Sequence, residues 1–260
     1  MAILRVSRRK FVTSAATAAV AGAGGVLLTG CERVAESPAA RALVRAGERL
    51  TMRAQRILMA RRPLVREFTA ADISKFFPTT GTERPGGDSY ARLVATDFRT
   101  FRLKVQGLVT RPLEFSLDEI RRLPHRTQIT QHQCDAGWSA IAQWRGVPVG
   151  HLLQLAGLRT EARYIVFHCL DAMDAAGEHY YESLDLFDAF HPQTILAYDM
   201  NDSALRVNHG APLRLRAELH IGYKNAKYVE SLEAVASLDG IRGGQGSYWA
   251  DRGFQWYVGM

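Results

Sequence analysis

The stretch that decides the fold is Gln131-His132-Gln133-Cys134-Asp135-Ala136-Gly137-Trp138-Ser139. It follows a strand-like segment at 126–131 and leads into a Gly-Trp-Ser turn. A thiolate at the end of a strand, held by a tight backbone, is well placed to ligate a soft metal. His132 lies two residues earlier, so its side chain is expected on the same strand face as Cys134. On these residues alone, Cys134 could instead be a buried structural cysteine, and His132 could be a polar side chain whose hydrogen bonds are made within the protein.

The N-terminus has the form of an export signal. Ser7-Arg8-Arg9-Lys10-Phe11-Val12 carries a twin-arginine pair, and a mildly apolar run rich in Ala and Gly follows at 15–28. That run is too short and too weakly apolar for a stable membrane-spanning helix. Leu28-Thr29-Gly30-Cys31 resembles a lipoprotein processing box, which predicts that Cys31 is lipidated and becomes the first mature residue. Ordinary signal cleavage beside Cys31 is the alternative.

The formal net charge of +7 comes largely from this signal. Residues 1–30 contain four basic residues and no acidic one, so the charge of the mature chain falls to +3. This balance gives no argument for nucleic acid as a partner. The length that remains is enough for one large domain with its own core. We expect a tether and a basic amphipathic helix at 31–67, and a single folded domain at 68–260.

The helical segment is predicted at 39–59. Leu43, Leu50 and Ile57 recur every seven residues, and five arginines recur every three or four residues as a basic stripe. Such a helix could lie against anionic lipid or an acidic partner. A solvated face on a helix that packs against the domain is the alternative.

The rest of the chain reads as short strands with few helices. Ser116 and Glu119 form a capping box for a short helix that ends near Pro124. Gly157 ends a second helix at 149–156, and a short helix or turn is expected at 184–190. Strands are expected at 101–109, 126–131, 164–169, 194–199, 212–216 and 228–235. Strands and helices do not alternate regularly, which predicts an α+β domain with a largely mixed sheet.

Two further segments carry chemistry: His209-Gly210-Ala211-Pro212-Leu213-Arg214 and Gly222-Tyr223-Lys224-Asn225-Ala226-Lys227-Tyr228. In this order and spacing, the Cys134 segment and these two resemble the molybdopterin-binding segments of sulfite-oxidase-type molybdenum enzymes. The resemblance covers roughly residues 70–257. The chain looks closest to a bacterial, twin-arginine-exported subfamily related to the periplasmic methionine-sulfoxide reductase catalytic subunit. This resemblance implies a sulfite-oxidase-like molybdopterin-binding fold in the domain at 68–260.

The implied cofactor is molybdenum–molybdopterin in the pterin form without a nucleotide. Its phosphate requires cationic side chains and free backbone N–H groups. Arg214 offers a guanidinium fork, and Lys224 and Lys227 offer point charges. A solvated surface position is the alternative for each of these charges taken singly.

The resemblance assigns roles residue by residue. Cys134 matches the molybdenum ligand. The positions matched to cofactor contacts are Cys169, His209, Arg214, the turn Asn225-Ala226-Lys227 and, where relatives carry an asparagine, Thr80. Cys169 stands in place of a threonine and His209 in place of an asparagine, so these are departures from the pattern. In an oxidising periplasm Cys134 and Cys169 could instead pair as a disulfide; a metal on Cys134 predicts that Cys169 stays a free thiol.

The departures bear on the substrate. Sulfite-oxidising members carry arginines just after the cysteine, whereas Asp135 to Ser139 offers none, which disfavours sulfite and leaves a sulfoxide or another small molecule. A protonatable group near the metal would assist oxygen-atom transfer, and Asp171, Asp174 and His179 are the candidates. The sequence has no Cys-x-x-Cys-His haem motif. Electrons are therefore expected to pass to or from a membrane b-type cytochrome or another quinone-linked carrier.

Three functions follow from these residues. The first is a molybdopterin-dependent oxidoreductase on the periplasmic side of the cell envelope, exported by the twin-arginine route and anchored to the membrane by lipid on Cys31. The second is a cysteine-nucleophile periplasmic acyl transferase, in which His132 or His168 activates Cys134. The third is a non-catalytic ligand-binding lipoprotein. Export of a folded, loaded protein and the cationic segments favour the first.

Overall fold

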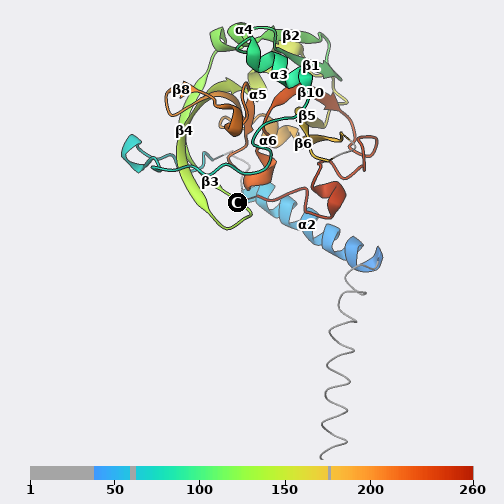
Figure 1. Cartoon of the computed structure of the whole chain (residues 1–260). Coiled ribbons are helices and arrows are strands. Elements are labelled where there is room, and N and C mark those ends of the chain that lie inside the picture. The colour runs from blue at the N-terminus through green and yellow to red at the C-terminus, as the bar shows by residue number, and fades with distance from the viewer. Residues whose placement is uncertain (1–37, 59–62, 175–176, 260) are drawn as a thin grey trace, which may run out of the picture. The chain divides into compact units, whose positions relative to one another are not determined.

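A computed structural model of the chain describes residues 38–58, 63–174 and 177–259 (Figure 1). The expected signal, Cys31 and the tether up to residue 37 lie outside the described residues. The chain divides into two compact units, 1–58 and 59–260, which are described separately.

The described part of the first unit is helix α2, Pro38–Leu58, which confirms the predicted helix. Leu43, Leu50 and Ile57 are 75%, 64% and 77% exposed. Because residues seven apart lie on one face of a helix, these side chains form an exposed apolar stripe. Among the described residues, no helix has both the length and the apolar character needed to cross a membrane.

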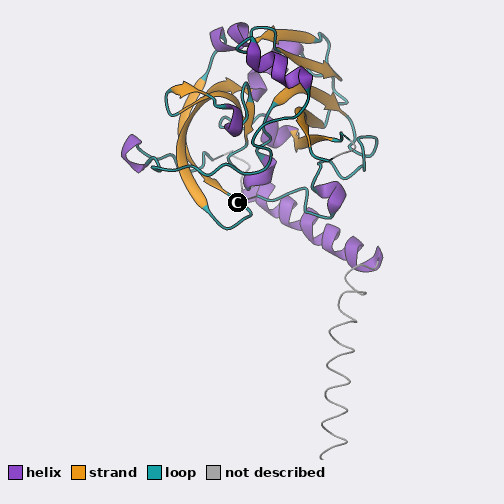
Figure 2. Cartoon of the chain, in the orientation of Figure 1, coloured by secondary structure: helices purple, strands orange, loops and turns teal. Residues whose placement is uncertain are grey.

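The second unit contains two five-stranded sheets (Figure 2). The first sheet has the strand order β2-β1-β10-β5-β6. Its members are β2 (Leu113–Ser116), β1 (Arg102–Gly107), β10 (Val229–Val235), β5 (Tyr164–Ala172) and β6 (His179–Asp185). β1 and β10 run parallel and the other pairs are antiparallel, so the sheet is mixed.

The second sheet is antiparallel throughout, with the order β3-β4-β7-β8 and with β9 paired to β7. Its members are β3 (Arg126–Gln133), β4 (Ser139–Pro148), β7 (Ile195–Met200), β8 (Ser203–Ala204) and β9 (Arg214–Arg216). Figure 1 shows β3 and β4 as long, curved strands. Together the two sheets confirm the expected α+β architecture.

Short helices precede, connect and follow the strands. They are α3 (Asp88–Ala95), α4 (Leu117–Arg122), α5 (Val149–Ala156), α6 (Leu186–Ala189) and the 3₁₀ turns η1 (Ala70–Asp72), η2 (Val207–His209), η3 (Gly222–Lys224) and η4 (Ala250–Arg252). The predicted capping box is present: the Glu119 amide donates to Ser116 Oγ and the Ser116 amide donates to Glu119 Oε2. α5 ends at Gly157, whose φ of 68° lies in the region that glycine tolerates best.

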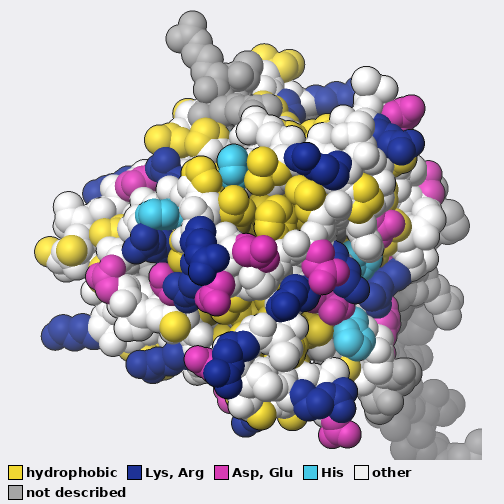
Figure 3. All heavy atoms as spheres, turned by 90° about the horizontal axis from the view of Figure 1, so that it is seen from above, with side chains coloured by type: hydrophobic (Ala, Val, Ile, Leu, Met, Phe, Trp, Pro, Cys, Tyr) yellow, Lys and Arg dark blue, Asp and Glu magenta, His cyan; other side chains and the backbone are white. Residues whose placement is uncertain are grey.

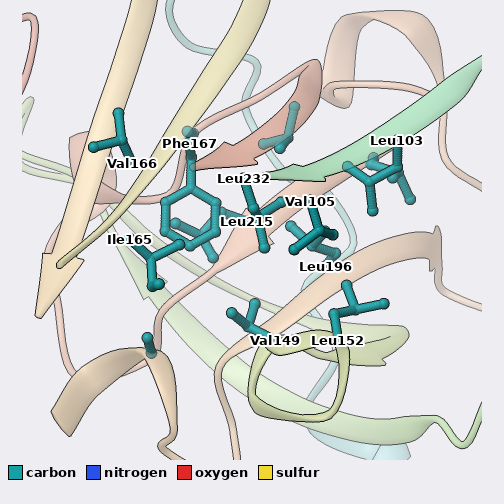
Figure 4. Packing of buried hydrophobic residues seen from close by; sticks show 14 of the residues in the cluster. Leu103, Val105, Val149, Leu152, Ile165, Val166, Phe167, Leu196, Leu215 and Leu232 are labelled. Carbon is teal, nitrogen blue, oxygen red and sulfur yellow. The ribbon is translucent and has the colours of Figure 1, made fainter. Parts of the chain in front are cut away.

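The core combines residues of both sheets and of α5 (Figure 4). Leu103, Ile165 and Leu232 come from the first sheet, and Leu196 and Leu215 from the second; each is fully buried. Burial of one such side chain contributes about 1.5–3 kcal/mol relative to leaving it in water. The sheets are thereby held against each other, which fixes the loops at their ends.

The surface is polar and mixed in charge. On the face seen from above, Lys and Arg side chains are interspersed with Asp and Glu, and apolar side chains lie between them (Figure 3). Charged groups of both signs are mixed on this face, so its charge does not by itself mark a functional site.

Candidate functional site

One cavity of about 350 Å³ gathers side chains from several separate parts of the domain. It is lined by the loop at 80–82, the end of β3 and the turn after it, the end of β5, Tyr180 of β6, Arg214 of β9, the segment at 222–227 and Trp249 of the C-terminal tail. Its lining includes seven residues predicted as site residues: Thr80, His132, Cys134, Arg214, Asn225, Ala226 and Lys227. The fold thus brings together the three segments that the sequence singled out.

Cys134 is the first residue after β3 and is held by a tight turn. Its amide donates to Trp138 O at 2.9 Å, and the Gly137 amide donates to Cys134 O at 3.1 Å. Gly137 has a φ of 86°, which this turn needs and which suits glycine. Gly222 packs closely from the other side, since a Cβ on it would lie 3.1 Å from Cys134 Cα. The thiol is therefore fixed at the cavity wall by backbone geometry.

The Cys134 thiol lacks the surroundings of an activated nucleophile. Burial raises its pKa, and the nearby Asp135 carboxylate raises it further. The Ala136 amide points at Sγ from 3.5 Å, which is a weak contact. A bound metal cation would reverse this balance by stabilising the thiolate.

Arg214 forms the cationic back of the cavity. It is 5% exposed, and its Nη1 and Nη2 donate to the carbonyl oxygens of His209 and Asn225 at 3.0 and 3.5 Å. Its Nε is buried and finds no acceptor within the described part of the chain. Burial and the neighbouring Arg216 lower the pKa of Arg214 to about 9, so the guanidinium remains charged at neutral pH.

Lys227 is the second cation of the cavity. Its ammonium donates to the carbonyl oxygens of Thr80 at 2.7 Å, Asn208 at 3.1 Å and Thr82. Burial and the charge of Arg214 lower its pKa to about 8. Over the described ranges, neither Lys227 nor Arg214 has a carboxylate partner within 4 Å. Two neighbouring cations held only by carbonyl groups make this wall a site for an anion.

Asp171 lines the cavity at the end of β5. Its side chain is buried, 4% exposed, and Oδ1 has no hydrogen-bond partner among the residues described. Burial raises the pKa of this carboxyl group. The other two candidates for a protonatable group are engaged elsewhere: His179 Nδ1 lies 2.9 Å from Cys169 O, and Asp174 accepts the Glu178 amide.

His132 lies inside the cavity wall, on the face of β3 that Cys134 continues. Arg216 Nη1 donates to its Nδ1 at 2.7 Å, so the histidine is a satisfied polar residue on that side. Burial, then the charges of Arg216 and Arg214, lower its pKa to about 2. A neutral imidazole of such low basicity cannot take the proton of the Cys134 thiol, which argues against the acyl-transferase alternative.

His168 is not brought to Cys134. It lies on β5 and its Nε2 is 2.8 Å from Glu233 Oε2, in a partly exposed hydrogen bond. The expectation that it activates the cysteine is therefore wrong. The strand carries it into the first sheet, whereas Cys134 ends a strand of the second.

The predicted contact of Lys224 with the cofactor is also corrected. Lys224 is fully buried, and its ammonium donates to Glu182 Oε1 and to Ser183 O rather than facing the cavity. The ring of Trp256 covers it, with Nζ 4.9 Å from the ring centroid. A cation already paired with a buried carboxylate is not available to an anionic ligand.

Cys169 and His209 contribute differently from the expectation. Cys169 is fully buried and lies behind the lining residues; it is a free thiol, as predicted, and so is Cys134. His209 packs its ring edge-on against Phe77 and supplies the carbonyl that holds Arg214. In the described structure its backbone carbonyl helps to hold Arg214, and a contact of His209 with the cofactor stays a prediction.

The lining residues that were not predicted as site residues include Met173, Tyr180, Tyr223 and Trp249. Tyr180 Oη donates to Tyr223 O at 2.6 Å, which fastens β6 to η3. Trp249 packs against Phe254 at 5.1 Å within the C-terminal tail. The aromatic tail was visible in the sequence, but no local pattern indicated that Trp249 would reach the cavity.

The chain matches the family described as oxidoreductase molybdopterin binding domain over residues 91–239. It is 36% identical over 198 residues to the putative protein-methionine-sulfoxide reductase subunit YedZ1 of Azospira oryzae, covering 74% of this chain and 70% of the relative. It is 29% identical over 152 residues to the protein-methionine-sulfoxide reductase catalytic subunit MsrP of Campylobacter jejuni, covering 54% of this chain and 51% of that protein.

Among solved structures, the sulfane dehydrogenase SoxCD from Paracoccus pantotrophus aligns with a TM-score of 0.48 and 25% identity, over 54% of this chain and 39% of that one. The family match and the YedZ1 relative carry the assignment. The chain belongs to the oxidoreductase molybdopterin-binding domain family, and it is a molybdenum-dependent oxidoreductase whose cofactor is molybdopterin.

Proposed function

We propose that this chain reduces a sulfoxide at a molybdenum centre ligated by Cys134, with electrons supplied by a membrane carrier at the cell envelope. The observation that carries the proposal is the placement of one thiol and two carbonyl-held cations, Arg214 and Lys227, in a single cavity. These residue types match the sulfur ligand and the phosphate contacts that a molybdenum–pterin group requires.

The residues present fit that cofactor. The buried Nε of Arg214 has no acceptor in the described chain, and an anionic phosphate oxygen would satisfy it. Lys227 would add a second charge-assisted contact from the opposite side of the turn at 225–227. The Cys134 thiol reaches the same cavity from the end of β3, as a metal ligand at its wall must.

The bound cofactor supplies two-electron oxygen-atom transfer. The chain's own residues bind and orient the reactants and handle protons. Reduction of a sulfoxide consumes two electrons and two protons and yields a thioether and water. Asp171 can hold one of these protons, because burial favours its neutral form and its Oδ1 has no other partner among the described residues.

The lining favours a sulfoxide over an oxyanion as the substrate. Met173, Tyr223 and Trp249 give the cavity an apolar and aromatic side, to which sulfur binds well. No arginine follows Cys134 before Ser139, so the cavity lacks the arginine pair that the sulfite-oxidising pattern places there. The names of the two relatives point to the same substrate class.

Replacement of the proposed ligand tests the function. Cys134→Ser protein is expected to fold, to lose sulfoxide reduction and to lose the molybdenum–thiolate absorption. Cys169→Ser is the matched control: this thiol is also buried but lies outside the cavity lining, so the variant should keep both signals. Sulfoxide reduction by Cys134→Ser at the rate of the control would refute Cys134 as the ligand.

We also propose that the enzyme works outside the cytoplasmic membrane as a lipoprotein. Arg8 and Arg9 support export after cofactor loading, Cys31 supports a lipid anchor, and a b-type cytochrome linked to quinone would deliver the electrons. Cys31→Ala should block fatty-acid labelling while the domain still binds molybdenum. Native protein that carries no fatty acid and fractionates with soluble periplasmic proteins would contradict the anchor.

A further inference from the structure

A row of four buried polar side chains stands behind the cavity: Gln128, His132, Arg216 and Glu218. Each is at most 4% exposed. Arg216 and Glu218 form a two-point ion pair, with Nε–Oε1 at 3.0 Å and Nη2–Oε2 at 2.6 Å. Gln128 Nε2 donates to Glu218 Oε1 at 2.9 Å, and Arg216 Nη1 reaches His132 Nδ1 at 2.7 Å. The carboxylate therefore fixes the guanidinium, and the guanidinium fixes the imidazole.

The contact between Arg216 and His132 determines which ring nitrogen carries the proton. A guanidinium group has N–H donors and no acceptor, so Nδ1 of His132 must accept. The ring proton then lies on Nε2. A proton on Nδ1 would place two donors 2.7 Å apart, so this conclusion rests on geometry and holds whatever the basicity of the ring.

The Nε2 atom faces the cavity. His132 lines the cavity, and no hydrogen-bond partner for Nε2 occurs in the part of the chain that the structure describes. The rings of Phe77 and Trp138 pack against the imidazole at 5.6 and 5.4 Å and hold its orientation. A side chain at Gly222 would put its Cβ 3.3 Å from Nε2, so glycine there leaves the donor accessible.

We propose that His132 is a fixed, uncharged hydrogen-bond donor whose Nε2–H binds an oxygen atom of the molecule held beside Cys134, and that Arg216 and Glu218 are positioning residues that set its tautomer. The identity of that molecule rests on the proposed function. The oxygen belongs either to the substrate, as the S=O group of a sulfoxide, or to the pterin, and both present the same acceptor chemistry.

An uncharged donor at this position favours a neutral oxygen over an anionic one. The positive charge of Arg216 is balanced by Glu218 at the far side, so His132 presents only an N–H dipole to the cavity. A guanidinium would strengthen binding of an oxyanion much more than binding of a sulfoxide. If the acceptor is the substrate, this arrangement favours a dipolar, uncharged oxygen.

The first test measures the tautomer directly. Histidine-¹⁵N correlation spectra of the full chain, recorded without and with cofactor, should show His132 with a protonated Nε2 and an unprotonated Nδ1. His132→Gln identifies the signals, because they disappear in that variant. A signal from the Nδ1–H form, or from a ring that exchanges rapidly between the two forms, would overturn the inference whether or not Cys134 binds molybdenum.

The second test locates the acceptor. His132→Leu removes the donor, whereas His132→Gln restores an N–H group on a side chain of similar reach. If the acceptor is the substrate, His132→Leu should raise KM for a sulfoxide about two- to tenfold at unchanged molybdenum content, and His132→Gln should recover part of this. If the acceptor is the pterin, cofactor content should fall instead and KM should hold. No change in either quantity would overturn the proposal.

The positioning role needs a variant that leaves no unpaired buried charge. Arg216→Met combined with Glu218→Gln removes both charges, since either single change would strand its partner. In the folded double variant the His132 spectrum should become a mixture of tautomers, and KM or cofactor content should shift as in His132→Leu. A purely structural role for the pair would leave the tautomer as in the wild type, and that result would refute the positioning role.

Discussion

Lys224 and Lys227 lie three residues apart, yet their ammonium groups meet opposite surroundings. Lys224 is fully buried against Glu182, whereas Lys227 faces the cavity and is held by three carbonyl oxygens. The first cation is neutralised inside the protein and stabilises it. The second is surrounded by carbonyl dipoles, which do not neutralise it, so its charge can still attract an anionic ligand. The comparison teaches that the partner of a cation, more than its position in a motif, indicates whether it binds a ligand.

The same division separates Arg214 from Arg216 on β9. Their guanidinium groups lie 4.9 and 4.6 Å from the ring of Trp144. Arg216 is paired with Glu218, while Arg214 bonds only to carbonyl groups. Each pair of neighbours thus contributes one structural cation and one that is available to an anion.

The largest expected effect is a loss of stability when Lys224, the structural cation, is replaced. Lys224→Met leaves Glu182 buried without its partner and should lower the free energy of unfolding by about 3–5 kcal/mol. Lys224→Met combined with Glu182→Gln should recover most of that loss, because no charge is then stranded. Urea unfolding of both proteins measures the difference. A single variant as stable as the wild type would mean that the buried pair contributes nothing.

The next largest effect is a loss of cofactor affinity when Arg214 is replaced. Arg214→Ala removes a charge-assisted contact worth about 1.5–3 kcal/mol, so cofactor affinity should fall roughly ten- to a hundredfold. The cofactor-free protein should lose little stability, because a buried charge without a carboxylate partner disappears with the side chain. Molybdenum and pterin content per chain, with urea unfolding of the cofactor-free form, measures both. Arg111→Ala is the control, since Arg111 also donates to a carbonyl but lies outside the cavity. Full occupancy in Arg214→Ala would place the phosphate elsewhere.

The smallest effect is a pH dependence of Lys227. Its pKa is lowered from 10.5 to about 8 by burial, so the folded, cofactor-free protein binds fewer protons than the unfolded chain between these values. The resulting penalty is fully present below about pH 8 and is relieved as pH rises toward 10.5. The stability of the wild type should therefore rise relative to that of Lys227→Met over this range. Parallel stability curves from urea unfolding at each pH would contradict the lowered pKa.

Local patterns were sufficient to predict several parts of the fold. The alternation of β3 placed His132 and Cys134 on one face, the Ser116–Glu119 box started α4, and Gly157 ended α5. The cavity contacts of Cys134, Arg214 and Lys227 followed from their segments. The strand face, the helix start and the helix end depend on neighbours in sequence, whereas the cofactor roles of Cys134, Arg214 and Lys227 came from the resemblance to the family.

One error arose where the partner is distant in sequence. Lys224 was predicted to contact the cofactor, but it pairs with the buried Glu182 of β6, 42 residues away. β4 was missed because its buried face alternates small residues, Ala140 and Ala142, before Trp144. The pairing of Glu182 with Lys224 across this separation cannot be seen in one sequence, so the role of Lys224 was misassigned.

The bonds of Lys227 also tie three chain segments together. The ammonium joins the loop at 80–82 and Asn208 to the turn at 225–227. The walls of the cavity are thus connected before any ligand arrives, so the conformational entropy of these loops is lost during folding and need not be lost again on binding. Such preorganisation lowers the entropic cost of taking up the cofactor, so more of the contact free energy appears as affinity.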